Sequence, residues 1–542
     1  MAAKRRPRSS SAMQAHRVGD DSHAESQYTD EVHKYLDRTC PHLLNSNSPP
    51  SEIEARNIAS FIHDARSELQ EADMEILSLQ QAMNLAKEKR SRIARCIAAP
   101  QAILSSIRRL PPEILSLIFA WGLPTKTYHV FDVKGVPWVL GQVCSRWRVT
   151  ALSFASLWST FTLTKYPRRA SLHPDYLIFL LNSALSRSRH KGLTFHYSPH
   201  TRRYPHNHLF IQALVRHAPR WSHVTLTGVP ENLVPHFFPA KGKLLSLQRL
   251  VLGRQSMGYI DLFEQAPRLH DVTYQPPPPQ SSAFSFPWSQ LTSIAIQDRF
   301  NTVMSVITLC TKLECLTHQL GFLAIWWDRN GVVGPRLVHN KLRVLRLDYP
   351  AILLPIVSFP SLQSLEIDGP SPEEYLGPLA SFIQTSGCSL QTLSLQMFKG
   401  IPHELYEVLK LCPEVYNLKL EIKDPGPAFE GLLKFLSQNG EHCEADVSPV
   451  LPKLRHLHIG VRRDPGDDTL TSEQEASSCY TMVDMISSRW AVNTGDSRER
   501  LRSIVYCADF ANDLKLSEID RLEEMKKEGL KVSVSLNDKK VI

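Results

Sequence analysis

Apolar positions spaced alternately by four and three residues begin soon after the Pro49-Pro50 pair. This spacing of 3.5 residues predicts one long helix with a heptad seam, about 60 Å long at about 1.5 Å per residue. Ser51 and Glu54 have the spacing of a capping box, and Pro100 is expected to end the helix, so we predict it over residues 51–99. The seam consists of Ile58, Ile62, Ala65, Leu69, Ala72, Ile76, Leu79, Met83, Ala86, Arg90, Ile93 and Ile97.

The seam allows two interpretations. In one, two copies pair through residues 51–99 as a coiled-coil homodimer and gain avidity from two binding surfaces. In the other, the helix lies along the rest of the protein, which its small alanines and the charged Arg90 favour.

A second apolar pattern runs from Trp221 almost to the end of the chain. Large apolar residues stand at positions 1, 4 and 6 of short segments, and the first position recurs at a strict period of 22 in Leu247, Leu269, Leu291 and Leu313 before the spacing loosens. The triads are Trp221/Val224/Leu226, Leu247/Leu250/Leu252, Leu269/Val272/Tyr274, Leu291/Ile294/Ile296, Leu342/Leu345/Leu347, Leu362/Leu365/Ile367, Leu390/Leu393/Leu395, Val415/Leu418/Leu420, Leu454/Leu457/Ile459 and Leu501/Ile504/Tyr506, with a partial copy at Leu313/Leu316.

Two further regularities accompany these triads. Proline stands two residues before five of them, and apolar trios at i, i+3, i+4 precede six of them. Helix, proline turn and short strand therefore describe one unit of an irregular α/β solenoid with the leucine-rich repeat core pattern, predicted over residues 166–535. Two unrelated α/β domains are the alternative. The trios are Ile211/Leu214/Val215, Val303/Val306/Ile307, Leu379/Phe382/Ile383, Leu405/Val408/Leu409, Leu432/Phe435/Leu436 and Met482/Met485/Ile486.

A helical hairpin is predicted between the long helix and the repeats. Pro111 and Pro112 suit a first helical turn. Behind them Ile114, Leu117, Ile118 and Trp121 form one apolar stripe, and Val143, Trp147, Ala151 and Phe154 follow at helical spacing after a connection over residues 124–138. Two short helices cannot bury so many large side chains against each other, so we expect an exposed apolar surface that binds a partner.

The order L-P-x-E-I-L-x-x-I-F, then V-C-x-x-W, then L-W resembles the F-box, although the connection over residues 124–138 is longer than the domain usually has. The resemblance covers less than a tenth of the chain, implies an F-box domain over about residues 100–165, and implies that it docks a Skp-type adaptor tied to a cullin scaffold and a RING ubiquitin ligase. The residues it implies for adaptor binding are Leu110, Pro111, Glu113, Ile114, Leu115, Ile118, Phe119, Val143, Cys144, Trp147, Leu157 and Trp158.

Composition adds few constraints. The chain has 542 residues, of which 42% are apolar and 21% charged, and its net charge of +8 arises largely from a basic first segment and a His-Arg-rich stretch near residues 187–203. Residues 1–50 have the composition of a disordered tail, in which Lys4 to Arg8 form either a nuclear-import signal or a solvated basic segment. The ten cysteines show no C-x-x-C, and no apolar run is long enough to span a bilayer, so we expect a cytoplasmic or nuclear protein without a membrane or nucleic-acid surface.

Motifs for catalysis and cofactors are absent from the sequence. It contains no G-x-G-x-x-G, no P-loop, no H-E-x-x-H and no G-x-S-x-G. The histidines between His190 and His208 lack neighbouring acidic residues or cysteines, so a solvated surface is favoured over a metal site. We therefore expect a non-catalytic protein without cofactor or metal.

Two functions follow from these predictions. The chain is either a substrate receptor of an SCF-type ubiquitin ligase or a leucine-rich-repeat scaffold in which the hairpin only caps the solenoid. In either case the non-core positions beside the triads are candidates for binding a protein target, namely Arg249, Arg343, Arg346, Gln363, Glu366, Arg455, His458 and Arg502. Their mixed charges predict no particular ligand.

Overall fold

The computed structural model divides the chain into two compact units, Met1–Leu110 and Pro111–Ile542. It describes residue 43 and residues 47–123, 127–164, 174–199, 206–253, 261–274, 285–297, 300–319, 336–369, 372–398, 400–423, 428–437, 449–462, 472–491, 498–509, 514–537 and 539–542. The predicted disordered tail, residues 1–50, therefore lies almost entirely outside the described residues.

The described residues of the first unit form one long helix, α3 (Glu52–Leu104), followed by the short 3-10 helix η1 (Ser106–Arg109). The Ser51 hydroxyl accepts from the Glu54 N–H, and the Glu54 carboxylate accepts from the Ser51 N–H at 2.8 Å, so the predicted capping box is confirmed.

The predicted end of this helix is wrong, because α3 continues through Pro100. A proline removes a single i to i−4 hydrogen bond, and here it lies within the last two turns. The flanking sequence IAAPQA supplies good helix formers on both sides, which favours continuation.

The predicted seam of α3 remains largely exposed. Leu69, Ile76 and Leu79 are 62%, 53% and 61% exposed, although these are large aliphatic side chains. The helix is therefore held by its own backbone hydrogen bonds and presents an apolar stripe.

The second unit is built on one long parallel sheet. Every neighbouring pair of strands is parallel except the last, β17 and β18. In spatial order the strands are β1 (Tyr128–His129), β2 (Thr160–Leu163), β3 (Leu193–Tyr197), β4 (Trp221–Leu226), β5 (Arg249–Leu252), β6 (Asp271–Tyr274), β7 (Ser293–Gln297), β8 (Cys315–Gln319), β10 (Val344–Leu347), β12 (Ser364–Asp368), β13 (Thr392–Phe398), β14 (Asn417–Lys423), β15 (His456–Arg462), β16 (Ser503–Ala508), β17 (Lys531–Leu536) and β18 (Lys539–Lys540). A separate parallel pair joins β9 (Leu337–Val338) to β11 (Val357–Ser358).

The register of this sheet stacks the predicted triads on one another. Leu250, Val272, Ile294 and Leu316, the fourth positions of successive copies, pair directly across β5 to β8. All members of the triads are buried. The strands predicted from the triads are confirmed, and one continuous sheet replaces the alternative of two unrelated domains.

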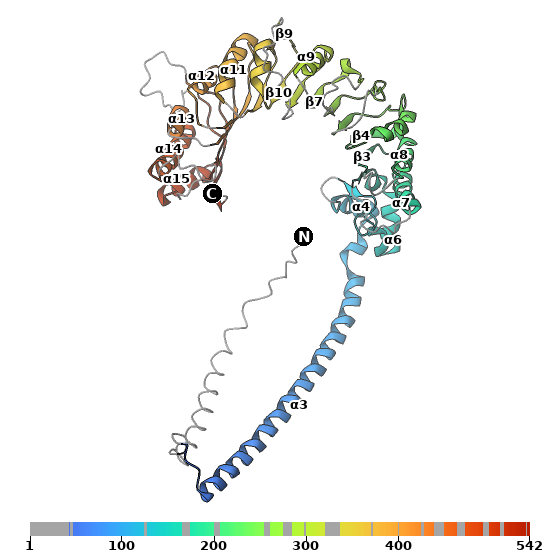
Figure 1. The fold of residues 1–542 in the computed structure, drawn as a ribbon, viewed down its shortest axis with the longest axis vertical. Coiled ribbons are helices and arrows are strands. Elements are labelled where there is room, and N and C mark those ends of the chain that lie inside the picture. The colour runs from blue at the N-terminus through green and yellow to red at the C-terminus, as the bar shows by residue number, and fades with distance from the viewer. Residues whose placement is uncertain are drawn as a thin grey trace. The chain divides into compact units, whose positions relative to one another are not determined.

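The helices of this unit cover one side of the sheet, and Figure 1 shows them along the outer side of an arc whose inner side is lined by the strands. The six apolar trios lie on α8, α9, α11, α12, α13 and α14 and supply their buried faces. The helices after the hairpin are α7 (Pro174–Arg187), α8 (Asn207–Val215), α9 (Phe300–Leu309), α10 (Pro350–Leu353), α11 (Pro372–Ser386), α12 (Glu404–Lys410), α13 (Ala428–Ser437), α14 (Ser472–Trp490) and α15 (Leu516–Lys527).

Two of the three repeats with a period of 22 residues differ from the predicted unit. Between β5 and β7 the described residues form turns and the short η5 (Trp288–Gln290) instead of α-helices. The repeat from Leu291 to Leu313 has the same length but contains α9, and none of the six predicted apolar trios falls in the two repeats before it.

The sheet also begins earlier than the triads predict. The connection over residues 124–138, expected to be a loop, contains β1, which pairs with β2 in the register Tyr128 to Phe161. Trp158, Phe161 and Leu163 are buried and repeat the 1, 4, 6 spacing in front of the first predicted copy. The sheet therefore starts within residues predicted to belong to the F-box domain.

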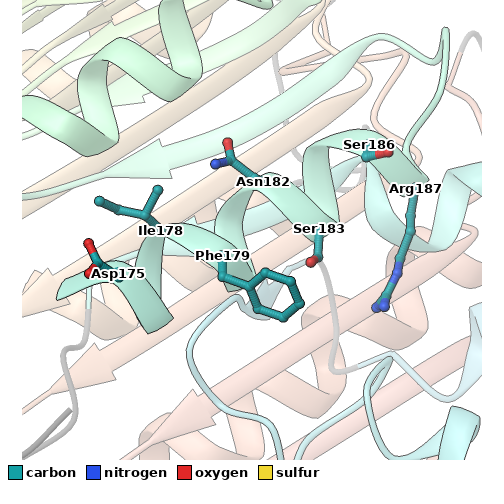
Figure 2. Close-up of a pocket in the computed structure, with 7 residues that line it drawn as sticks. All are labelled: Asp175, Ile178, Phe179, Asn182, Ser183, Ser186 and Arg187. Carbon is teal, nitrogen blue, oxygen red and sulfur yellow. The ribbon is translucent and has the colours of Figure 1, made fainter. Parts of the chain in front are cut away.

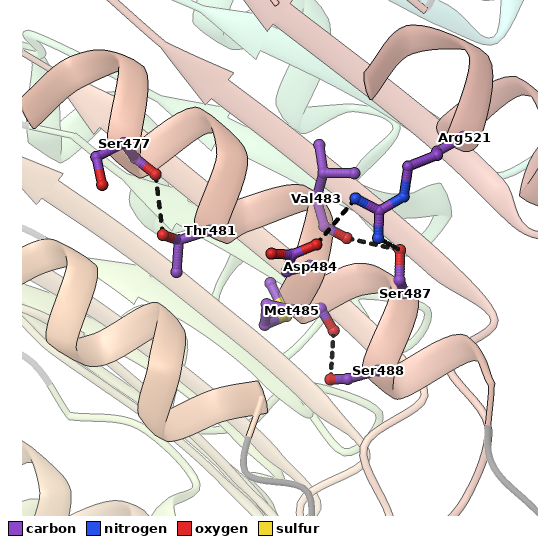
Figure 3. A network of polar contacts seen from close by, with 8 residues as sticks. All are labelled: Ser477, Thr481, Val483, Asp484, Met485, Ser487, Ser488 and Arg521. Carbon is purple, nitrogen blue, oxygen red and sulfur yellow. Dashed lines mark hydrogen bonds and ion pairs between the residues drawn. The ribbon is translucent and has the colours of Figure 1, made fainter. Parts of the chain in front are cut away.

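Two arginines fasten the C-terminal helices. Arg521 of α15 donates to the Asp484 carboxylate at 2.9 Å and to the Ser487 hydroxyl at 3.0 Å, both on α14 (Figure 3). Arg489, near the end of α14, is 1% exposed, and its guanidinium donates to the backbone oxygens of Leu436, Val450 and Leu451 at 2.7–3.0 Å. Arg489 thus ties α14 to the end of α13 and to the turn before β15.

Candidate partner-binding surfaces

The hairpin after residue 110 has a small aromatic core. It consists of α4 (Pro112–Trp121), α5 (Leu140–Val143) and α6 (Ser145–Ser153). Phe119 of α4 is 2% exposed and packs on Trp147 of α6 with ring centroids 4.9 Å apart. The Cys144 sulfur accepts from the Trp147 N–H at 3.4 Å and so caps α6. Leu115 and Phe119 are the side chains that α4 contributes to the interior.

The other face of α4 is apolar but exposed. Ile114, Leu117 and Ile118 are 44%, 56% and 42% exposed, and Trp121 is 89% exposed. These residues form the i, i+3, i+4, i+7 stripe seen in the sequence, so the stripe points outward while α4 uses a different pair of residues to pack. Exposed apolar groups of this size on one short helix are typical of a binding surface.

The neighbouring helices also carry exposed apolar side chains. Val143 at the end of α5 and Val149 of α6 are 57% and 68% exposed, and Leu152 is exposed one turn after Val149. We call the exposed apolar residues of α4 to α6 the hairpin surface. Its members are Ile114, Leu117, Ile118, Trp121, Val143, Val149 and Leu152.

The twelve residues implied for adaptor binding divide between this surface and the interior. Leu115, Phe119, Leu157 and Trp158 are at most 2% exposed, and Trp147 is half-buried, so these residues shape the hairpin and do not themselves face a partner. Leu110 is half-buried at the end of the first unit. Those with exposed side chains are Pro111, Glu113, Ile114, Ile118, Val143 and Cys144.

Sequence reasoning missed two members of the hairpin surface, Val149 and Leu152. Their spacing of three residues places them on one face of a helix and could have indicated them. Sequence reasoning instead followed the larger apolar set that contains Trp147.

Aromatic side chains join the hairpin to the sheet. The indole N–H of Trp158 donates to the Ala151 carbonyl at 2.7 Å, and Trp138 packs edge-on against Trp158 at 5.0 Å. The Arg187 guanidinium of α7 lies over both indoles, 4.9 and 4.5 Å from their centroids, and burial lowers the pKa of this arginine. The hairpin is thereby fixed to the first strands as one body.

The hollow shown in Figure 2 is a weaker candidate. All seven residues that line it belong to α7, among them Phe179 and Arg187. A groove built from a single helix has no opposite wall to enclose a ligand, so we assign no site to it.

The side of the sheet away from the helices is the second candidate surface. Non-core residues of successive strands pair across it, and opposite charges meet: Arg249 Nε lies 3.2 Å from the Asp271 carboxylate, and Arg346 Nε lies 2.9 Å from that of Glu366. Such exposed ion pairs add little to the stability of the fold. Their side chains are therefore candidates for polar contacts with a bound protein.

The other candidate arginines lie at the edge of the sheet. Arg343, Arg455 and Arg502 each stand one residue before their strand begins. Arg455 forms a two-armed ion pair with Glu499, which raises the pKa of the arginine through the hydrogen bond. These three therefore belong to the N-terminal edge of the strands, and Gln363 stands at the same place before β12.

The sheet surface over β14 and β15 carries a charged group that the sequence did not single out. Glu421 accepts from His458 at 3.0 Å and pairs with Lys419 at 3.2 Å, and these hydrogen bonds lower the pKa of Glu421 to about 2. Asp348 directly follows β10, which β12 and β13 separate from β14, and burial and the charges of Asp368 and Glu366 raise its pKa to about 6. The alternation of buried and exposed residues along β10 to β15 was the signal that could have located them.

Within the described part of the chain no group of three or more His, Cys, Asp or Glu residues is arranged to hold a metal ion. Nor is any described helix long and apolar enough to cross a membrane.

The fold defines a class of protein: a mixed α/β chain with a long, mostly parallel sheet and an N-terminal helix, consistent with a leucine-rich-repeat-like α/β fold. No known protein family and no curated protein matches the sequence. Among solved structures, an internalin from Listeria monocytogenes aligns over 67% of this chain and 77% of its own, at 11% identity and a TM-score of 0.23.

Proposed function

We propose that the protein is a substrate receptor of an SCF-type cullin-RING ubiquitin ligase. The hairpin surface docks a Skp-type adaptor, and the sheet surface of the repeats recruits the protein to be modified. Catalysis then belongs to the partners, and the receptor contributes proximity by holding a target lysine near the conjugating enzyme.

The observation that carries this proposal is the outward-facing stripe of α4. A helix that only packed against its neighbours would bury Ile114, Leu117 and Ile118, whereas each is more than 40% exposed and Trp121 is 89% exposed. These residues lie in the segment whose sequence resembles the F-box, and two of them, Ile114 and Ile118, are among the residues that the resemblance implies for adaptor binding.

A second candidate function is favoured by the early start of the sheet. Because β1 and β2 belong to the hairpin segment and pair with each other at the first edge of the sheet, the hairpin also has the features of a solenoid cap. In that case the chain is an interaction scaffold without a ligase role.

Co-purification of the full chain with a Skp-type adaptor distinguishes the two. Ile118→Asp combined with Val143→Asp should abolish adaptor binding while the melting temperature stays close to that of the wild type, since both side chains are exposed. Phe179→Asp, which changes a somewhat more exposed apolar residue on α7, is the control and should retain the adaptor. A folded wild-type chain that binds no adaptor would overturn the proposal and favour the scaffold.

A further inference from the structure

Large and small side chains are distributed unevenly between the a and d positions of the exposed seam of α3. In heptad notation the a positions are Ile62, Leu69, Ile76, Met83, Arg90 and Ile97, and the d positions are Ile58, Ala65, Ala72, Leu79, Ala86 and Ile93. Every seam alanine thus occupies a d position, and the only charge occupies an a position. Seven of the eight large apolar seam side chains are at least 43% exposed, so the surface is open for a partner helix.

A parallel pair of such helices would be poorly packed. In parallel coiled coils a faces a and d faces d. Ala65, Ala72 and Ala86 would then each face the same alanine of a second copy and leave voids, and Arg90 would face Arg90 with like charge.

An antiparallel pair removes both problems, because a positions then face d positions. If Leu79 lies opposite Met83 of a second copy, the other seam pairs follow by counting residues forward along one helix and backward along the other. Each alanine meets a larger side chain, as follows: Ala86 with Ile76, Ala72 with Arg90, and Ala65 with Ile97.

The charges beside the seam select the same arrangement. In its first half α3 carries Asp73 and Glu75 at the flanking e and g positions, and in its second half it carries Lys87 and Lys89. In the register with Leu79 opposite Met83, Glu75 lies beside Lys89 of the second copy and Asp73 beside Lys87. A parallel pair would forgo these attractions.

We propose that α3 forms an antiparallel coiled-coil homodimer centred near residue 81. The occupant of the exposed seam is a second copy of this chain, and the overlap uses residues 58–104, about 70 Å of helix at about 1.5 Å per residue. The C-terminal ends of the two helices lie at opposite ends of the coil. This inference is independent of adaptor binding, since it involves no residue of the hairpin surface.

A cysteine cross-link in the full-length protein tests the orientation. Cys96 is exposed, and in the proposed register it lies beside Glu68 of the second copy. Mild oxidation of Glu68→Cys should therefore give a covalent dimer whose disulfide joins positions 68 and 96, identified by mass spectrometry of the unreduced peptides. Within one helix these positions are about 42 Å apart, so the link must be between chains.

The matched control is Ala65→Cys, which gives a disulfide between two copies of position 65 only in a parallel coil. A cross-link of that kind would overturn the proposal. So would a wild-type protein that light scattering shows to be a 61.5 kDa monomer at micromolar concentration.

A charge exchange tests the register without cysteine chemistry. Glu75→Lys should raise the dissociation constant of the dimer about tenfold, because two attractive pairs become repulsive. Adding Lys89→Glu should restore it. Glu71→Lys makes the same reversal on the outer face of the helix and should have no effect, and equal weakening by both reversals would refute the register.

Discussion

Replacing Arg489 by methionine is expected to destabilise the C-terminal repeats by about 3–5 kcal/mol. The wild-type guanidinium is 1% exposed and donates to three backbone carbonyls at 2.7, 3.0 and 2.8 Å. Methionine fills a similar volume but donates nothing, so three buried acceptors lose a charged donor, at a cost of about 1–3 kcal/mol each. Relief from burying the charge offsets part of this sum.

Urea denaturation of the full chain measures the change, and hydrogen exchange locates it. Exchange should accelerate in α13, in α14 and in the turn before β15, because Arg489 joins these three segments. Arg502→Met, at an exposed position in the next repeat, should stay within about 0.5 kcal/mol of the wild type. A loss below about 1 kcal/mol for Arg489→Met would refute the reasoning that the arginine serves as a structural tie.

Three further predictions concern charge and capping. Because the folded pKa of Asp348 is raised to about 6, its contribution to stability is complete below about pH 4 and is lost as the pH rises through 6; Asp348→Asn should raise the melting temperature at pH 8 but not at pH 4. The pKa of Glu421 is lowered to about 2, so its pairing with His458 stabilises the fold above about pH 4.5, and Glu421→Gln should lower the melting temperature at pH 7 and have little effect at pH 2, where the wild type has already lost most of this stabilisation. Ser51→Ala removes the acceptor for the Glu54 N–H and should cost α3 about 1 kcal/mol, seen as faster hydrogen exchange in its first turn.

The predictable parts of this fold were those set by local periodicity. The triads predicted the strands of the long sheet from β4 to β16 because a strand in a stacked repeat must place the same face inward every time, and the apolar trios predicted α8, α9 and α11 to α14 for the same reason. Between β5 and β7 the pattern kept its leucines but the described residues form no α-helix, in agreement with the absence of a predicted trio there, whereas the equally long repeat from β7 to β8 contains α9.

The candidate surfaces were less predictable. The stripe of α4 was visible as a pattern, but a pattern does not say which way it faces. The outward orientation of Ile118 and the inward orientation of Phe119 depend on where Trp147 packs, which is a tertiary contact. Likewise, Glu421 and His458 meet only because parallel strands 37 residues apart in sequence lie side by side.

The sequence by itself determined the long heptad helix with its capping box, the strands of the repeats and the apolar richness of the hairpin, since each depends on spacing within a few turns or residues. The tertiary structure decided that the sheet begins at β1 inside the hairpin segment, that α4 turns its stripe outward, and that charges from separate repeats pair across the sheet. These features depend on which distant segments pack together, and the free energy of that packing is spread over contacts that no local pattern records.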